Sequence, residues 1–82
     1  MIILDVRVPA LDKTYNFSLE ERANIGELIE EITELIKQKE GQTFCGAYRE
    51  LALFSVDRET MLNPNCTLSG YGIQGGDELI LL

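Results

Sequence analysis

The 82 residues contain no histidine and no tryptophan, and only two cysteines and two prolines. Without histidine the chain lacks the commonest general base, the commonest metal ligand and the usual partner of a serine or cysteine nucleophile. Cys45 and Cys66 are not in CxxC spacing, and two thiols alone can complete neither a structural zinc site nor an iron–sulfur cluster. We therefore expect no metal, no cofactor and no enzyme activity.

Basic residues are also scarce, because seven Lys and Arg stand against fourteen Asp and Glu, giving a net charge of −7. Binding to a nucleic-acid backbone requires clustered cations, whereas the cations of this chain are scattered along it. They are Arg7, Lys13, Arg22, Lys37, Lys39, Arg49 and Arg58. We expect no nucleic-acid partner. An acidic surface suits solubility or a basic protein partner.

Long apolar runs are missing as well, so the sequence offers no transmembrane segment. The opening residues, MIILDVRV, contain an early acid and no small-residue cleavage site, which argues against a signal peptide. We expect a cytoplasmic protein with reduced thiols. No linker, repeat or low-complexity segment divides the chain, so residues 1–82 are expected to form one domain.

The clearest pattern that is present predicts a helix between Asn24 and Gly41. Six apolar side chains recur there at steps of three and four, which places them on one face. They are Ile25, Leu28, Ile29, Ile32, Leu35 and Ile36. Asn24 and Glu27 are spaced as a capping box, and Gly41 is placed to end the helix.

Alternating side chains predict strands on both sides of this helix. Residues 2–8 direct Ile2, Leu4, Val6 and Val8 to one face, with Ile3 on the other. Residues 14–19 alternate in the same way, and 50–56 and 78–82 are short apolar runs. Residues 61–62 read as a brief return strand, and a short helical turn is expected near Leu68. Phe44 is expected to close one end of the core.

The element order is therefore β-β-α-β-β-β. A mixed five-stranded sheet with the helix packed on one face covers every apolar surface economically, with the first and last strands parallel in the middle. This α+β arrangement is the β-grasp fold. The lack of cysteines excludes a β-grasp ferredoxin.

Two other patterns suggest chemistry but have simpler explanations. Gly70, Gly72, Gly75 and Gly76 resemble a phosphate loop, yet they lead into a strand and lack the lysine of a P-loop, so we interpret them as turn glycines. The acids at 27–34 could suggest a cation site, but on an exposed helix face they are expected to be the solvated side.

Two stretches of the chain resemble ubiquitin. One is KTYNFSL at 13–19, followed by an acidic link and a helix ending in KQKEG. The other is TLSGYGIQ at 67–74 followed by LIL at 79–81, which resembles the Thr-Leu-Ser-x-Tyr-x-Ile-Gln segment and last strand of ubiquitin. The resemblance implies a ubiquitin-like β-grasp fold.

A closer resemblance is to the YukD-like proteins, small ubiquitin-like accessory components of bacterial type VII secretion. It rests on Cys66-x-Leu68-Ser69-x-x-Gly72-Ile73-x-x-Gly76-Asp77-x-Leu79-x-x-Leu82, on the length of the chain and on the helix opening from Ile25 to Ile29. The resemblance implies a non-enzymatic adaptor or regulatory component of such a system. Gly75 and Gly76 are internal, which implies docking and not conjugation.

Two alternatives remain open from the sequence. One is a ubiquitin-like modifier or sulfur carrier, which would need a longer C-terminus. The other is a ubiquitin-like cytosolic domain of a membrane permease.

Strand alternation also predicts a partner-binding surface on the face of the sheet away from the helix. Five apolar side chains are expected there as one patch, with Phe54 as an aromatic anchor. These are Ile3, Ala52, Phe54, Ile80 and Leu82. A homodimer contact is the competing use of this patch.

Overall fold

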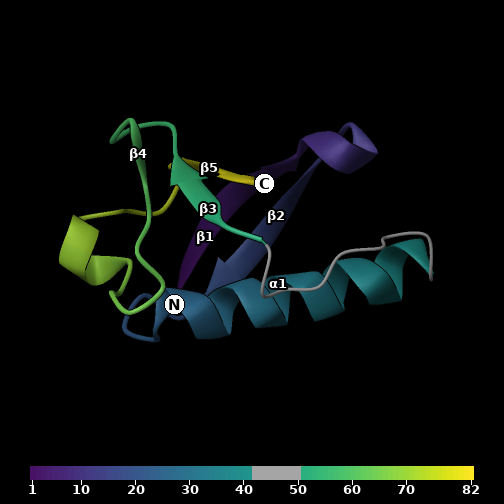
Figure 1. Cartoon of the computed structure of the whole chain (residues 1–82). Helices are drawn as coiled ribbons and strands as arrows, with labels where there is room; N and C mark the ends of the chain where they lie inside the picture. The colour runs from purple at the N-terminus through teal and green to yellow at the C-terminus, as the bar shows by residue number, and fades with distance from the viewer. Residues whose placement is uncertain (42–50) are drawn as a thin grey trace.

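The computed structural model describes residues 1–41 and 51–82, so the predictions made for Phe44 and Cys45 lie outside the described residues. The elements follow the predicted order, with two short 3₁₀ turns added (Figure 1). They are β1 (Ile2–Val8), η1 (Pro9–Leu11), β2 (Lys13–Leu19), α1 (Ile25–Glu40), β3 (Leu53–Ser55), β4 (Thr60–Met61), η3 (Ser69–Tyr71) and β5 (Glu78–Leu81).

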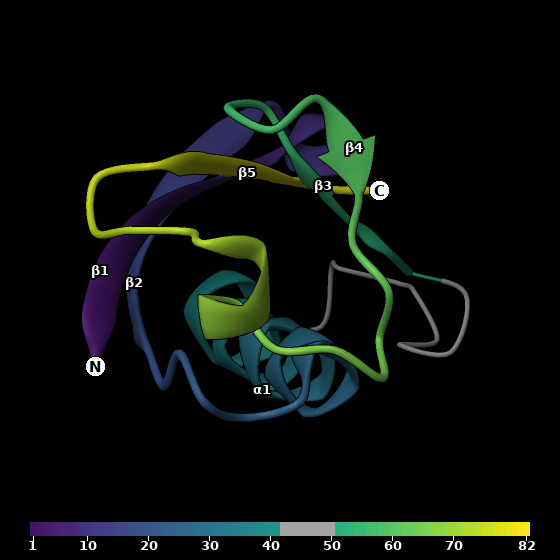
Figure 2. The same ribbon diagram turned by 90° about the vertical axis from the view of Figure 1, so that its left-hand side faces the viewer.

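The five strands form one mixed sheet in the order β2-β1-β5-β3-β4. β1 and β5 are parallel in the interior of the sheet, and every other neighbouring pair is antiparallel. α1 lies across one face of this sheet, as Figures 1 and 2 show from two directions. The predicted fold class, a β-grasp sheet with one helix on one face, is confirmed.

A single core fills the space between α1 and the sheet. The inward residues of β1 alternate as predicted, with Leu4, Val6 and Val8 buried and Ile3 exposed. The predicted mid-stripe residues Ile29 and Ile32 belong to the same buried cluster. On the sheet side this cluster includes Leu4, Val6, Phe17, Leu53, Leu79 and Leu81.

The start of α1 is built differently from the prediction, because the Asn24 side chain makes no capping hydrogen bond. The first helical N–H groups are instead satisfied by backbone carbonyls of a distant loop. Ile25 N–H donates to Cys66 O at 2.8 Å, and Gly26 N–H donates to Pro64 O at 2.9 Å. Tertiary contact thus replaces the expected capping box. Gly41 follows the helix with a φ of 67°, as expected of a terminating glycine.

β3 is shorter than the predicted run at 50–56, but its pairing extends further than the strand itself. Ala52 and Leu82 exchange two backbone hydrogen bonds of 3.0 and 2.9 Å, and Val56 N–H donates to Glu78 O at 3.1 Å. The outward alternation therefore continues from Ala52 through Phe54 to Val56.

The segment that resembles ubiquitin is held together by its polar groups. Thr67 Oγ1 accepts from Gly70 N–H at 3.0 Å, and the Tyr71 hydroxyl accepts from Asn63 N–H at 2.9 Å. Gly72 has a φ of 72° and Gly76 a φ of 93°, a region that glycine adopts without strain. These glycines make turns, which confirms their structural interpretation.

Candidate functional site

The face of the sheet opposite α1 carries one row of side chains that crosses four strands. Arg7 of β1 lies opposite Ile80 of β5, Ile80 lies opposite Phe54 of β3, and Phe54 lies opposite Met61 of β4. Residues directly opposite each other in a sheet place their side chains on the same face. Ile80, Phe54 and Met61 are therefore neighbours on the open face.

Three further apolar side chains flank this row. Leu82 and Ala52 form the next pair along β5 and β3, and Val56 lies two residues beyond Phe54 on the same face. We call these six side chains the apolar cluster: Ala52, Phe54, Val56, Met61, Ile80 and Leu82. Val56, Met61 and Leu82 are exposed, at 36%, 48% and 54%, and the other three are half-buried.

Four of the five residues predicted from the sequence therefore lie together, and Ile3 does not join them. The register of β1 and β5 pairs Asp5 with Glu78, so Ile3 is aligned with Gly76 and is separated from Ile80 by about 13 Å of strand. Ile3 is 59% exposed, but polar side chains lie between it and the apolar cluster. That the cluster binds a partner stays a prediction.

The sequence pattern missed Val56 and Met61. Val56 could have been found by continuing the alternation from Phe54 by two residues. Met61 could not, because its position depends on the register between β3 and β4, which pairs it with Phe54.

The other half of the open face is polar. Arg7 forms an ion pair with Glu78, and Asn16 Nδ2 donates to Asp5 Oδ1. The first pair places a guanidinium and a carboxylate at the border of the apolar cluster, beside Ile80. A partner that covers the cluster would therefore meet both charge signs at this border.

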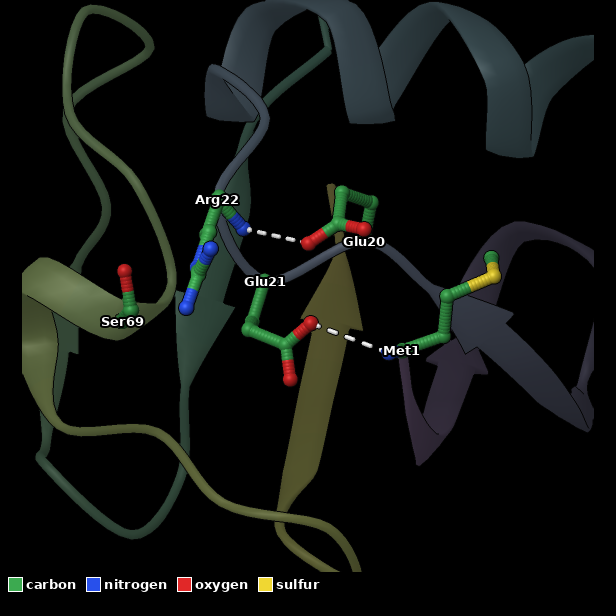
Figure 3. A pocket seen from close by; sticks show the side chains of 5 residues that line it. All are labelled: Met1, Glu20, Glu21, Arg22 and Ser69. Atoms are coloured by element: carbon green, nitrogen blue, oxygen red, sulfur yellow. Dashed lines mark hydrogen bonds and ion pairs between the residues drawn. The ribbon is translucent and has the colours of Figure 1, made fainter.

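A shallow depression lies elsewhere, where the link between β2 and α1 meets η3 (Figure 3). The Met1 ammonium pairs with Glu21 Oε1 at 3.1 Å, and Arg22 N–H donates to Glu20 Oε1 at 3.1 Å. Ser69 N–H donates to Glu21 O at 2.9 Å. A backbone hydrogen bond, followed by the Met1 ammonium, lowers the pKa of the Glu21 carboxyl. These carboxylates are engaged in holding the turn, and no nucleophile–base pair is formed among the lining residues.

The far end of α1 is joined to β2 by a second polar group. Lys13 Nζ lies 2.8 and 2.9 Å from the two oxygens of Glu40, and the Tyr15 hydroxyl donates to Glu40 Oε2 at 2.5 Å. Hydrogen bonds from Lys13 and then from Tyr15 lower the pKa of Glu40. Burial, followed by the hydrogen bond to Glu40, raises the pKa of Tyr15 to about 12. This cluster ties the helix to the sheet and orients no group toward a cavity.

Cys66 is an exposed free thiol on the loop that caps α1. Within residues 1–41 and 51–82, no three His, Cys, Asp or Glu side chains gather closely enough to hold a metal ion. In the same part of the chain, no helix combines the length and hydropathy that a bilayer span requires. Of the surfaces described, the apolar cluster is the one whose composition suits contact with another molecule.

The sheet order, the parallel central strands and the helix across one face define a ubiquitin-like fold. Among solved structures, the ubiquitin-like domain of an Arabidopsis thaliana protein is 16% identical, with a TM-score of 0.75 over 99% of this chain and 74% of that one. The N-terminal ubiquitin-like domain of the 4931431F19Rik protein is 21% identical, with a TM-score of 0.77 over 99% of this chain and 72% of that one.

A third similar structure is that of ATBAG1 in complex with HSP70, with 16% identity and a TM-score of 0.71. The match covers the whole of this chain and 40% of that one. At these identities the likenesses establish a shared fold and not a shared activity. No family model matches the sequence, and no curated protein matches it. Membership of the YukD-like family stays a prediction.

Proposed function

We propose that this chain is a non-enzymatic docking domain that binds a protein partner through the apolar cluster. The observation that carries the proposal is the row formed by Ile80, Phe54 and Met61, which continues over three strands with no charged side chain between its members. A contiguous apolar patch on a protein surface usually marks an interaction site, whereas isolated exposed apolar residues need no explanation.

The most specific form of the proposal follows from the sequence resemblance to the YukD-like proteins. In that form the chain is an adaptor or regulatory component of a bacterial type VII secretion system and acts by docking, not by conjugation. The ubiquitin-like fold supports this form because the YukD-like proteins are themselves ubiquitin-like. ATBAG1, which contains a similar fold, was solved in complex with HSP70.

The test is complementation in a bacterium that contains this gene and a type VII system. Deletion of the gene should reduce export of the substrates of that system, and the wild-type chain should restore export. The Phe54→Asp variant should fold but fail to restore export, because a carboxylate at the centre of the cluster must be desolvated on binding. Binding to a copurifying component of the system should weaken by at least about tenfold.

Ile3→Asp is the matched control, since Ile3 is exposed on the same face but separated from the apolar cluster. This variant should restore export as well as the wild-type chain does. Unchanged export after deletion of the gene would exclude the secretion role. Full activity of a folded Phe54→Asp variant would exclude the apolar cluster as the docking site, and a defect in both variants would extend the site to Ile3.

A further inference from the structure

The backbone groups of β1 alternate between its two neighbouring strands. Asp5 N–H donates to Asp77 O at 3.2 Å, and Ile3 O accepts from Gly76 N–H at 2.8 Å. The N–H and C=O groups of Ile3 and Asp5 therefore face the segment that contains β5. Because successive residues of a strand direct these groups to opposite sides, the even-numbered residues of β1 face β2.

This alternation determines which backbone groups of β2 are left over. Leu4 lies opposite Phe17, so the odd-numbered residues of β2 make the hydrogen bonds to β1. Thr14, Asn16 and Ser18 direct their N–H and C=O groups away from β1. In the described part of the chain no strand pairs with β2 on that side.

β2 also lacks the features that normally protect an outer strand from pairing with other chains. Its ladder with β1 runs through seven consecutive pairs without a bulge, and the strand contains no proline. Its one charged side chain, Lys13, is neutralised by Glu40 at 2.8 Å. Natural outer strands are usually shortened, bulged, charged or interrupted by proline. A flat strand of seven residues without these features is a template for another strand.

The charge distribution favours a second copy of this chain as that strand. Each copy carries a net charge of −7, so two copies repel unless they meet along an uncharged line. The outward residues Thr14, Asn16 and Ser18 form such a line. The unpaired acids of α1, such as Glu30 and Glu31, lie on a different surface, on the exposed side of the helix.

We propose that the outer edge of β2 pairs antiparallel with the same edge of a second copy, on a two-fold axis that passes beside Asn16. In this register Asn16 faces Asn16, and Thr14 faces Ser18 on each side. All three outward residues are then used, with two backbone hydrogen bonds at each of the three pairs. An isologous contact requires a self-complementary surface, and a strand whose outward residues are symmetric about Asn16 provides one.

The same register is favourable on the helix side of the sheet. Tyr15 of one copy lies beside Phe17 of the other, in a pair where the two backbones approach to about 4.5 Å. Cross-strand aromatic pairs are among the stabilising pairs of antiparallel sheets. Tyr15 and Phe17 are already stacked within each chain, with ring centroids 5.6 Å apart, so four rings would form one row.

A contact made by one strand edge is small compared with a standard protein interface. The dimer is therefore reversible, with a dissociation constant in the range of about 10 µM to 1 mM. The contact joins two five-stranded sheets into one continuous sheet and leaves the apolar cluster of each copy, at the opposite side of the sheet, open.

The test is to measure the mass of the 82-residue chain by sedimentation equilibrium up to about 1 mM. Hydrogen exchange of individual amides is followed by NMR over the same concentrations. We expect a monomer–dimer equilibrium, with slower exchange at high concentration for the amides of Thr14, Asn16 and Ser18. Exchange of the Thr60 amide, on the other outer strand, should not change.

Two variants at one position isolate the backbone contact. Asn16→Pro removes an N–H group that the monomer does not use, and proline is tolerated on the solvent side of an outer strand. It should weaken dimerisation by at least about tenfold. Asn16→Thr also removes the side-chain bond to Asp5 but keeps the N–H group, so it should dimerise as the wild-type chain does. Phe54→Asp, on the apolar cluster, should dimerise normally.

A chain that stays monomeric to about 1 mM would overturn the proposal, even if a foreign peptide protected the β2 amides. So would a dimer that Phe54→Asp abolishes and Asn16→Pro leaves intact, because the apolar cluster would then be the contact. If Asn16→Pro fails to fold, the wild-type exchange data decide. Concentration-dependent protection at residues 14, 16 and 18 supports the proposal, and its absence refutes it.

Discussion

Ile32 lies at the centre of the core, with no part of its side chain exposed to solvent. Replacing it with alanine removes buried methyl and methylene groups and leaves a cavity that the neighbouring side chains fill only in part. We expect Ile32→Ala to lower the free energy of unfolding by roughly 2–5 kcal/mol. Urea denaturation followed by circular dichroism measures this loss.

The adjacent residue offers a control for helix propensity. Glu31 is exposed, so Glu31→Ala should change the free energy of unfolding by less than about 0.5 kcal/mol. An equally small loss for Ile32→Ala would mean that the helix does not pack on the sheet through this side chain.

Tyr15 gives the protein a stability that depends on alkaline pH. Its pKa is raised from 10.0 to about 12, so the folded state keeps the phenolic proton more tightly than the unfolded state does. The resulting stabilisation is complete below pH 10 and is lost as the pH rises through about 12. Urea denaturation of the wild-type chain should therefore show stability falling over this range.

Tyr15→Phe removes the titrating group and the hydrogen bond to Glu40. The variant should be less stable than the wild-type chain near neutral pH, and the difference should shrink as the pH rises above 10. Lysine titration affects both chains alike and cancels in the comparison. A difference that is constant across the range would show that Tyr15 titrates with the same pKa in both states.

At the level of elements, the N-terminus of α1 is determined by contacts far away in the sequence. Pro64 O and Cys66 O accept the first helical N–H groups, whereas the Asn24 side chain makes no capping bond. We expect Asn24→Ala to lower the free energy of unfolding by less than about 0.5 kcal/mol, whereas an ordinary Asn cap contributes about 1 kcal/mol. Thermal or urea unfolding distinguishes these values, and a loss of about 1 kcal/mol or more would restore the capping box.

The same element illustrates how far sequence reasoning reaches. The limits of α1 follow from the apolar stripe and from Gly41, because both signals are local. The cap could not be predicted correctly, because Asn24 and Glu27 fit a capping box and nothing local indicates that Pro64 will approach Gly26. Among the described residues, local periodicity determined the elements, and tertiary contacts determined their ends.

The open face of the sheet shows a similar division. Outward positions such as Phe54 and Ile80 follow from alternation alone. The separation of Ile3 from Ile80 and the approach of Met61 to Phe54 depend on strand register. Register is determined by the packing of the whole core, so a side-by-side relation between strands cannot be obtained from either strand separately.

At the scale of the whole molecule, acids outnumber bases by fourteen to seven. Several exposed carboxylates of α1, including Glu27, Glu30 and Glu31, take part in no ion pair, so repulsion among them opposes folding. We expect the free energy of unfolding to increase, by about 1 kcal/mol or less, between low salt and about 0.5 M NaCl, because salt screens exposed charges.

Urea denaturation at the two salt concentrations tests this expectation. A double variant, Glu30→Gln with Glu31→Gln, should be more stable at low salt and should respond less to added salt. A wild-type stability that falls with salt would indicate that the ion pairs, such as Arg7–Glu78, outweigh the repulsion.

The position of β5 between β1 and β3 also has a consequence for synthesis on the ribosome. The hairpin of β1 and β2 and the helix emerge first, but β3 has no partner in the interior of the sheet until residues 78–81 have left the exit tunnel. Until then the apolar side of each early strand is exposed to other nascent chains and to chaperones. The rate at which the codons of β5 are translated therefore determines how long each new molecule remains prone to aggregation.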